Sequence, residues 1–200
     1  TELLIGEEGI EKLHNSKVIV FGIGGVGSFV VEALTRAGVG NLILVDNDTV
    51  CISNLNRQIH ATQATVESVK VEAMKARVLS INPNCKVEAK QEFITADNIQ
   101  DIIPEDIDYV VDAIDTVTSK LALAEYCYKN DIKLIASMGT GNKIDPTQFR
   151  VTDVFKTKVC PLAKVMRTEL RKRGVKKLKV VYSEEVPMVP NKGRAVPSKK

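Results

Sequence analysis

The sequence predicts an α/β protein built on a Rossmann-like, doubly wound and mostly parallel β-sheet with helices on both faces. Short β-branched apolar runs alternate with longer amphipathic stretches through the first 145 residues. The runs are apolar at consecutive positions, as expected for parallel strands that are covered on both sides. A glycine-rich segment directly follows the first run, and a basic helix–strand extension ends the chain.

The individual elements follow in order. The Asn-Pro pair at 82–83 is a helix stop, so a strand is expected at 85–89. After residue 145, an extended segment at 148–154 precedes a helix at 161–173, which Pro161 opens and Gly174 closes, and a strand at 178–182. Residues 186–200 contain three prolines and no periodicity, which predicts a loop or disordered tail. The remaining predicted elements are strands at 18–21, 42–45, 109–113 and 134–136 and helices at 29–37, 69–81 and 121–128.

Composition indicates one domain with an uneven charge. The 200 residues are 44% hydrophobic, which suits a single medium-sized domain. No signal-peptide pattern and no bilayer-length apolar stretch is present, so a cytoplasmic location is expected. Residues 1–155 carry 14 Lys and Arg against 22 Asp and Glu, or −8, whereas residues 156–200 carry 14 against 3, or +11. The basic segment is either a solvated helix face or a footprint for a polyanion such as RNA.

The four cysteines lie more than 30 residues apart from one another, which excludes a CxxC zinc knuckle or redox pair. Most of them are expected to be buried apolar thiols. Cys160 precedes Pro161 near a helix N-cap, where the dipole lowers a thiol pKa, but a structural role is the favoured interpretation. His14 and His60 receive no catalytic role, and each is expected to be a hydrogen-bonded structural group.

The glycine-rich loop predicts nucleotide binding. Gly22, Gly24, Gly25 and Gly27 stand between a strand and a helix, where backbone N–H groups and the helix dipole can hold a phosphate. Asp46 lies 24 residues after Gly22, just past the second strand, and can accept hydrogen bonds from a ribose. The alternative is that Asp46 only caps its loop. These features fit NAD as well as ATP.

Three charged residues favour ATP. The loops that carry the glycines, Asp46 and Asp115 leave the sheet at the same edge and are expected to converge on one crevice. A triphosphate needs cations, which Arg57 and Lys70 can supply, and Asp115 can hold a magnesium ion that bridges phosphate oxygens. Taken singly, Arg57 and Lys70 would be surface charges and Asp115 a helix N-cap.

Three motifs connect the first 150 residues to a known family. They are the GxGGxG loop followed by Asp-Asn-Asp at 46–48, NLNRQ at 54–58 and DAID at 112–115. In this order and spacing, residues 3–150 resemble the ThiF/MoeB/HesA superfamily, relatives of the ubiquitin-activating enzymes that adenylate carboxylates with ATP and Mg²⁺. The resemblance also implies a homodimer and leaves a place for a monovalent cation. It implies that Asp46 binds ribose, that Asn54, Arg57 and Lys70 bind phosphates, that Asp115 holds Mg²⁺ and the reacting phosphate, and that Arg57, Lys70 and Asp115 are catalytic.

The basic segment resembles one branch of this superfamily. TKVCPLAKVMR at 157–167, LRKRG at 170–174 and VYSEE at 181–185 are similar to the tRNA threonylcarbamoyladenosine dehydratases of the TcdA/CsdL branch. Their implied chemistry is adenylation of the threonyl carboxylate by ATP, followed by ring closure through an internal nitrogen or oxygen with AMP as leaving group. The resemblance implies tRNA as a partner, and a cysteine desulfurase or sulfur-acceptor system as another. Residues 1–155 would then be the ATP-binding adenylation domain, and 156–200 its basic extension.

Two further functions stay open: adenylation of the C-terminus of a ubiquitin-like sulfur carrier, and an NAD-binding redox or sensor module. The lack of CxxC pairs argues against the first, whose enzymes often hold a structural zinc. The sequence also departs from the family pattern. An arginine-containing segment is usual before the position of Thr1, an apolar segment usually follows the basic region, and 66–69 reads VESV where a Gly-Lys pair is common. A truncated form of the family's chain is therefore expected.

Overall fold

The structure, a computed structural model, describes residues 1–189. The tail expected at 186–200 lies mostly outside the described residues, and residues 186–189 form neither helix nor strand. No helix among the described residues is long and apolar enough to cross a lipid bilayer.

One seven-stranded sheet forms the centre of the protein. Its strand order is β3-β2-β1-β4-β5-β7-β6, and every neighbouring pair is parallel except β6 and β7. The predicted Rossmann-like α/β class is confirmed. The strands are β1 (Lys17–Phe21), β2 (Asn41–Val45), β3 (Lys86–Lys90), β4 (Tyr109–Asp112), β5 (Leu134–Ser137), β6 (Phe149–Asp153) and β7 (Lys179–Ser183).

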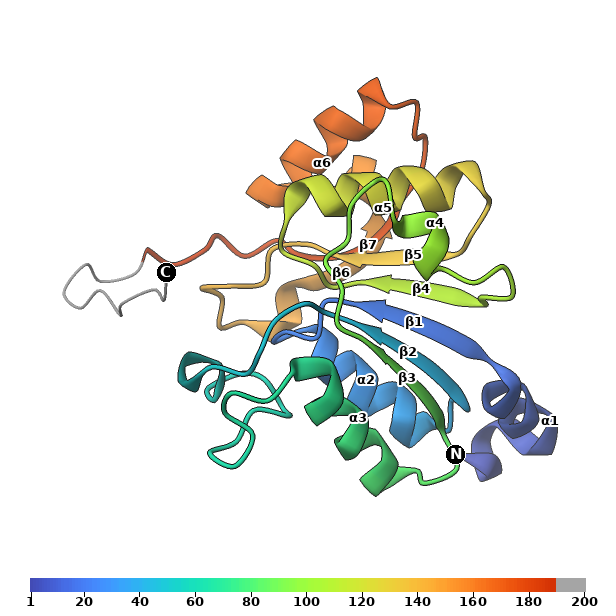
Figure 1. The fold of residues 1–200 in the computed structure, drawn as a ribbon. Coiled ribbons are helices and arrows are strands. Elements are labelled where there is room, and N and C mark those ends of the chain that lie inside the picture. The colour runs from blue at the N-terminus through green and yellow to red at the C-terminus, as the bar shows by residue number, and fades with distance from the viewer. Residues whose placement is uncertain (190–200) are drawn as a thin grey trace.

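Helices cover both faces of this sheet. In Figure 1, α4, α5 and α6 lie on one side of the strands, and α2 and α3 lie on the other. The helices predicted in the first 145 residues are present, with ends shifted by a few residues. The α-helices are α1 (Glu2–Asn15), α2 (Gly27–Ala37), α3 (Lys70–Ile81), α4 (Ile99–Ile102), α5 (Val117–Lys129) and α6 (Pro161–Lys172), and short 3-10 turns are η1 (Ile52–Asn54), η2 (Pro146–Gln148) and η3 (Val154–Lys156).

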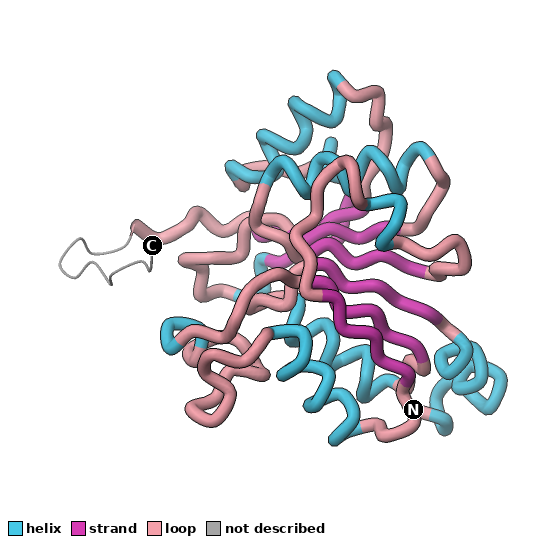
Figure 2. The backbone as a smooth tube through the Cα atoms, viewed as in Figure 1, coloured by secondary structure: helices cyan, strands magenta, loops and turns pink. Residues whose placement is uncertain are grey.

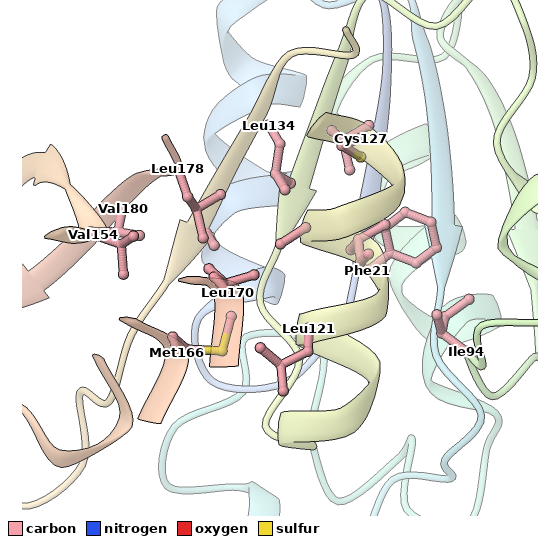
Figure 3. Packing of buried hydrophobic residues seen from close by; sticks show 14 of the residues in the cluster. Phe21, Ile94, Leu121, Cys127, Leu134, Val154, Met166, Leu170, Leu178 and Val180 are labelled. Carbon is pink, nitrogen blue, oxygen red and sulfur yellow. The ribbon is translucent and has the colours of Figure 1, made fainter. Parts of the chain in front are cut away.

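The sheet separates two hydrophobic cores because its central strands are apolar at consecutive positions. Alternate residues of β1 point to opposite sides, so that Phe21 packs under α5 and Val20 packs under α2 and α3. Figure 3 shows Phe21 near α5, with Leu121, Met166 and Leu170 in the same cluster. Each fully buried side chain of this size stabilises the fold by about 1.5–3 kcal/mol.

The basic segment is built into this architecture. Helix α6 buries Ala163, Met166 and Leu170, which recur at helical spacing, and leaves most of its basic side chains toward solvent. Strand β7 then pairs in parallel with β5 and antiparallel with β6. The segment that carries the positive charge therefore also supplies an internal strand of the sheet.

Helix α1 was not predicted. It fully buries none of its residues, and Leu3 and Leu4 are almost fully exposed; only Leu13, near its end, packs partly buried against the core on the α2 and α3 side. Gly6 interrupts the helical geometry with φ 71° and ψ 176°. The helix lies at the periphery of the fold, and its carboxyl end leads into β1 (Figure 1).

Candidate functional site

A cavity of about 680 Å³ opens at the edge of the sheet where the parallel strands end. Figure 2 shows long loop stretches gathered at this edge. The loops after β1, β2, β3, β4 and β5 line the cavity, and the loop after β2 runs on to the start of α3. The structure thus brings together the residues proposed from the sequence: Gly22, Gly24, Gly25, Asp46, Asn54, Arg57, Lys70 and Asp115.

Two glycines of the loop shape its turn, and two face the cavity. Gly22 has φ +84°, and a Cβ there would lie 2.7 Å from the Ala113 carbonyl oxygen. A Cβ on Gly27, which opens α2 and does not line the cavity, would lie 1.8 Å from the Gly22 oxygen. The atom nearest to a Cβ on Gly24 would be Gln58 Nε2, at 3.9 Å. Gly24 therefore borders the open cavity and is not packed tightly against other residues. The start of α2 is therefore accessible to an anion, which the helix dipole attracts.

Asp46 ties the loop after β2 to the glycine loop. Its Oδ2 accepts a hydrogen bond from the Ile23 N–H at 2.7 Å, and its Oδ1 accepts one from the Asp48 N–H at 2.9 Å. Each carboxylate oxygen has a further lone pair, so the group can still accept hydrogen bonds from a ligand in the cavity.

Lys70, predicted to supply positive charge to a triphosphate, is already paired with a carboxylate in this structure. The side chain is buried, and its Nζ donates to Asp48 Oδ2 at 2.7 Å and lies 4.0 Å from Asp46 Oδ1. The Asp48 side chain is 60% exposed, so this partner can turn toward solvent. An anionic ligand would compete with Asp48 for the ammonium group.

Arg57 supplies a positive charge that no carboxylate neutralises within residues 1–189. Its guanidinium donates to the Ser53 carbonyl at 2.8 Å and to Asn56 Oδ1 at 3.0 Å, both uncharged acceptors. Asn54 is buried, and its Oδ1 accepts from the Cys51 N–H at 2.9 Å, which leaves its amide N–H₂ available. Gln58 is buried beside the glycine loop, and its Oε1 has no hydrogen-bond partner among the described residues.

Asp115 lies on the cavity wall after β4 and is exposed. Its one described side-chain contact is a long hydrogen bond of 3.4 Å from Thr116 Oγ1. The described part of the chain contains no cluster of three or more His, Cys, Asp or Glu side chains that could hold a metal. A lone carboxylate of this kind suits Mg²⁺, which takes one or two protein carboxylates and completes its shell with phosphates and water.

A buried ion pair stands beneath this loop. Asp112 Oδ2 lies 2.9 Å from Lys120 Nζ, and both side chains are 0% exposed. Asp112 Oδ1 also accepts a hydrogen bond from the Ile114 N–H at 3.0 Å, immediately before Asp115. Burial raises the pKa of Asp112, and the neighbouring Lys120 opposes that change. The hydrogen bond from the Ile114 N–H to Asp112 thus holds the loop at 113–115, which packs against Gly22.

Two sequence-based expectations about single residues had different outcomes. His60 was expected to be hydrogen-bonded, which is wrong: it is 3% exposed, and neither ring nitrogen has a partner among residues 1–189. Burial and the charges of Lys70 and Arg77 lower the pKa of His60 to about 4. Cys160 is buried in the core beside α6, in agreement with the structural interpretation.

Sequence reasoning missed the part of the wall that follows β5. Ser137, Met138 and Gly139 line the cavity, and Leu162 of α6 faces them. Gly139 and Gly141 follow a predicted strand, and glycines after a parallel strand were the available signal. Helix α6 could not be placed here from sequence because its position depends on the β5–β7 pairing.

The sheet order, the glycine loop at the start of α2 and the charges around the cavity define a Rossmann-like nucleotide-binding protein with a site suited to a polyphosphate. Comparison with known families agrees. Residues 2–180 match the ThiF family, and the chain belongs to that family.

Comparison with individual proteins gives more specific similarities. The chain is 52% identical over 189 residues to the tRNA threonylcarbamoyladenosine dehydratase of Bacillus subtilis, covering 94% of this chain and 74% of that protein. It is 44% identical to the enzyme of the same name from Escherichia coli, covering 86% of this chain and 64% of that protein. The crystal structure of E. coli TcdA in complex with ATP superposes with a TM-score of 0.90 at 40% identity, covering 94% of this chain and 81% of that one.

Proposed function

We propose that this protein is an ATP-dependent dehydratase that cyclises threonylcarbamoyladenosine in tRNA. The observation that carries the proposal is the 52% identity, across 94% of the chain, to a dehydratase of that name. The nucleotide part is supported by the cavity, in which the unneutralised Arg57 and the free carboxylate of Asp115 face the same space as the glycine loop.

Each cavity residue has a proposed role that follows from its chemistry. Asp46 accepts hydrogen bonds from the ribose, and the backbone at Gly24 and Gly25 holds phosphate oxygens. Arg57 and Lys70 offset the negative charge of the triphosphate, with Lys70 exchanging Asp48 for phosphate. Asn54 would donate its amide N–H₂ to a phosphate oxygen, and Asp115 would hold Mg²⁺, which would supply positive charge against the triphosphate.

The proposed reaction has two steps, adenylation of the carboxylate and ring closure. A threonyl carboxylate oxygen attacks the α-phosphorus of ATP, and pyrophosphate leaves. An internal nitrogen or oxygen then attacks the activated carbonyl carbon and loses its proton, and the bond from that carbon to the AMP oxygen breaks. The carboxylate oxygen departs with AMP, so the nucleoside loses one water. The protein's part is to hold the reacting groups together and to stabilise negative charge at the phosphorus, where Arg57 contributes roughly 2–4 kcal/mol.

The partners follow from the same proposal. The basic segment at 156–189 presents Lys158, Lys164, Lys176 and Lys177 as exposed side chains, and among the described residues none of them is in an ion pair. We assign this surface to tRNA phosphates. A homodimer, a sulfur-acceptor system with its cysteine desulfurase, a monovalent cation and a cytoplasmic location complete the proposal and are supported by family resemblance alone.

The test is incubation of the full chain with ATP, Mg²⁺ and tRNA that carries threonylcarbamoyladenosine, followed by mass spectrometry of the nucleoside. Loss of one water is the expected result. Asp115→Ala should abolish the Mg²⁺-dependent product while keeping the wild-type unfolding curve, because the exposed Asp115 side chain makes one long hydrogen bond, with Thr116, among the described residues. Asp101→Ala, an exposed acid on α4, is the matched control and should keep full activity. Normal turnover in Asp115→Ala would disprove the assigned role, and tight NADH binding without ATP binding would favour a redox module instead.

A further inference from the structure

A second cavity, of about 520 Å³, lies at the opposite end of the strands from the nucleotide cavity. We call it the amino-end pocket. The first residues of β4, β5 and β7 line it, together with the last turn of α5 and the end of β6. Neither the proposed adenylation chemistry nor the family motifs use any of these residues.

The walls of the amino-end pocket are apolar and aromatic. Cys127, Leu134 and Leu178 are buried lining residues, and Tyr109 and Tyr128 line the pocket as half-buried side chains. Such walls favour a flat, weakly polar group, because aromatic faces stack with heterocycles.

The rim of the pocket is positively charged. Lys133, Lys177 and Lys179 are exposed there, and within residues 1–189 no carboxylate lies within ion-pair distance of them. Lys179 reaches only the phenolic oxygen of Tyr109, at 3.5 Å.

The two carboxylates at the pocket do not cancel this charge. Both oxygens of Asp153 accept main-chain hydrogen bonds, from the Phe155 N–H at 2.9 Å and the Leu178 N–H at 3.1 Å. Asp131 is exposed on the loop after α5. Three cations against two acids leave an excess positive charge around an aromatic-walled cavity, which is the combination that binds a base and its phosphate.

We propose that the amino-end pocket binds one unpaired nucleotide of the RNA substrate. Its base would lie against Tyr109 and Tyr128, and its phosphates would contact the three rim lysines. The inference rests on the proposed function, since it assigns part of the tRNA contact surface. The two cavities flank the same strand, because Leu134 at the start of β5 lines one and Ser137 at its end lines the other. At about 3.3 Å per residue these positions are roughly 10 Å apart, so one RNA molecule can reach both cavities.

The test replaces the rim lysines and measures binding of unmodified tRNA by fluorescence anisotropy over a range of salt concentrations. In the triple variant Lys133→Gln, Lys177→Gln, Lys179→Gln, affinity at about 0.1 M salt should fall at least tenfold. The slope of log affinity against log salt should become shallower by about 2, as expected for three phosphates of a single strand. ATP affinity should stay at the wild-type value, because the altered residues lie at the other end of the sheet.

The matched control removes the same charge elsewhere. Lys12→Gln, Lys75→Gln, Lys86→Gln changes three lysines of α1, α3 and β3, none of which lines either cavity. This variant should change tRNA affinity less than about threefold. Equal losses in the two triple variants would overturn the proposal, because binding would then follow net charge alone.

A second measurement tests the base. Tyr128→Leu keeps apolar volume but removes the ring, and should weaken tRNA binding roughly 5- to 150-fold, the value of one stacked base. Ultraviolet crosslinking should attach a nucleotide to the peptide that contains Tyr128. Unchanged tRNA affinity in Tyr128→Leu, together with no crosslink, would show that the amino-end pocket does not bind RNA. Failure of the wild type to bind tRNA at all would instead reject the proposed function, and this inference with it.

Discussion

Replacing Asp112 with asparagine should destabilise the protein by about 3–5 kcal/mol, because the change leaves the Lys120 ammonium buried without a counter-charge. Both side chains are 0% exposed and their charged atoms are 2.9 Å apart. Asparagine has nearly the same shape as aspartate and keeps an Oδ1 that can accept from the Ile114 N–H. The substitution removes the negative charge and also places an amide N–H₂ donor opposite the Lys120 ammonium, so both changes contribute to the loss. A loss of this size is a large fraction of the 5–15 kcal/mol that usually separates folded from unfolded states.

The assay is urea unfolding at pH 7 of the wild type, Asp112→Asn, Lys120→Met and the double variant. Each single variant leaves one buried group unpaired, whereas the double variant removes both charges, so it should be more stable than the sum of the single losses predicts. The expected coupling energy is at least about 2 kcal/mol. Single losses below about 1 kcal/mol that add without coupling would refute the reasoning and would mean that water or a neighbouring dipole solvates the pair.

Three further predictions concern the glycine loop, His60 and Arg57. Gly22→Ala should cost about 2–4 kcal/mol of unfolding free energy, because of its φ of +84° and a clash at 2.7 Å, whereas Gly24→Ala should leave stability unchanged and weaken ATP binding in calorimetry. Similar stability losses in the two variants would contradict this. Wild-type stability should fall by about 3 kcal/mol from pH 6.5 to pH 4, since unfolding releases His60 from a pKa of about 4 to its ordinary 6.5 and the unfolded chain binds the extra proton. His60→Gln should flatten that decline in pH-dependent urea unfolding, and an unchanged slope would exclude His60 as its source. Arg57→Ala should slow turnover by roughly 2–4 kcal/mol of activation free energy without changing the unfolding midpoint, and wild-type kcat/KM would remove Arg57 from the reaction.

Much of the parallel sheet could be predicted because its signal is local. β1, β2, β4 and β5 are short apolar runs, and the glycines after β1 identify the edge at which a ligand binds. Once the strands are known to be parallel, Asp46 and Asp115 must lie at the same edge, which is how the sequence predicts that they line one cavity.

The features that were missed depend on contacts between distant segments. The pairing of Lys70 with Asp48 requires the exact course of the loop between β2 and α3, which carries no periodic pattern. The lack of hydrogen-bond partners for His60 among the described residues could not be predicted either, because a sequence does not reveal which polar groups will lie near a buried ring. Helix α1 was missed for another reason: only Leu13 packs against the core, and Gly6 interrupts the helix, so its helical pattern is weak.

The position of β7 between β5 and β6 also determines when the sheet can be completed during translation. β6 leaves the ribosome about 30 residues before β7, yet its described sheet partner is β7. Until Ser183 has been synthesised, β7 cannot fill its place between β5 and β6, so the β5 edge of the sheet has no strand partner. An unpaired strand edge promotes aggregation, because it can pair with another chain. We therefore expect the described part of the chain to be most prone to aggregation just before β7 is added.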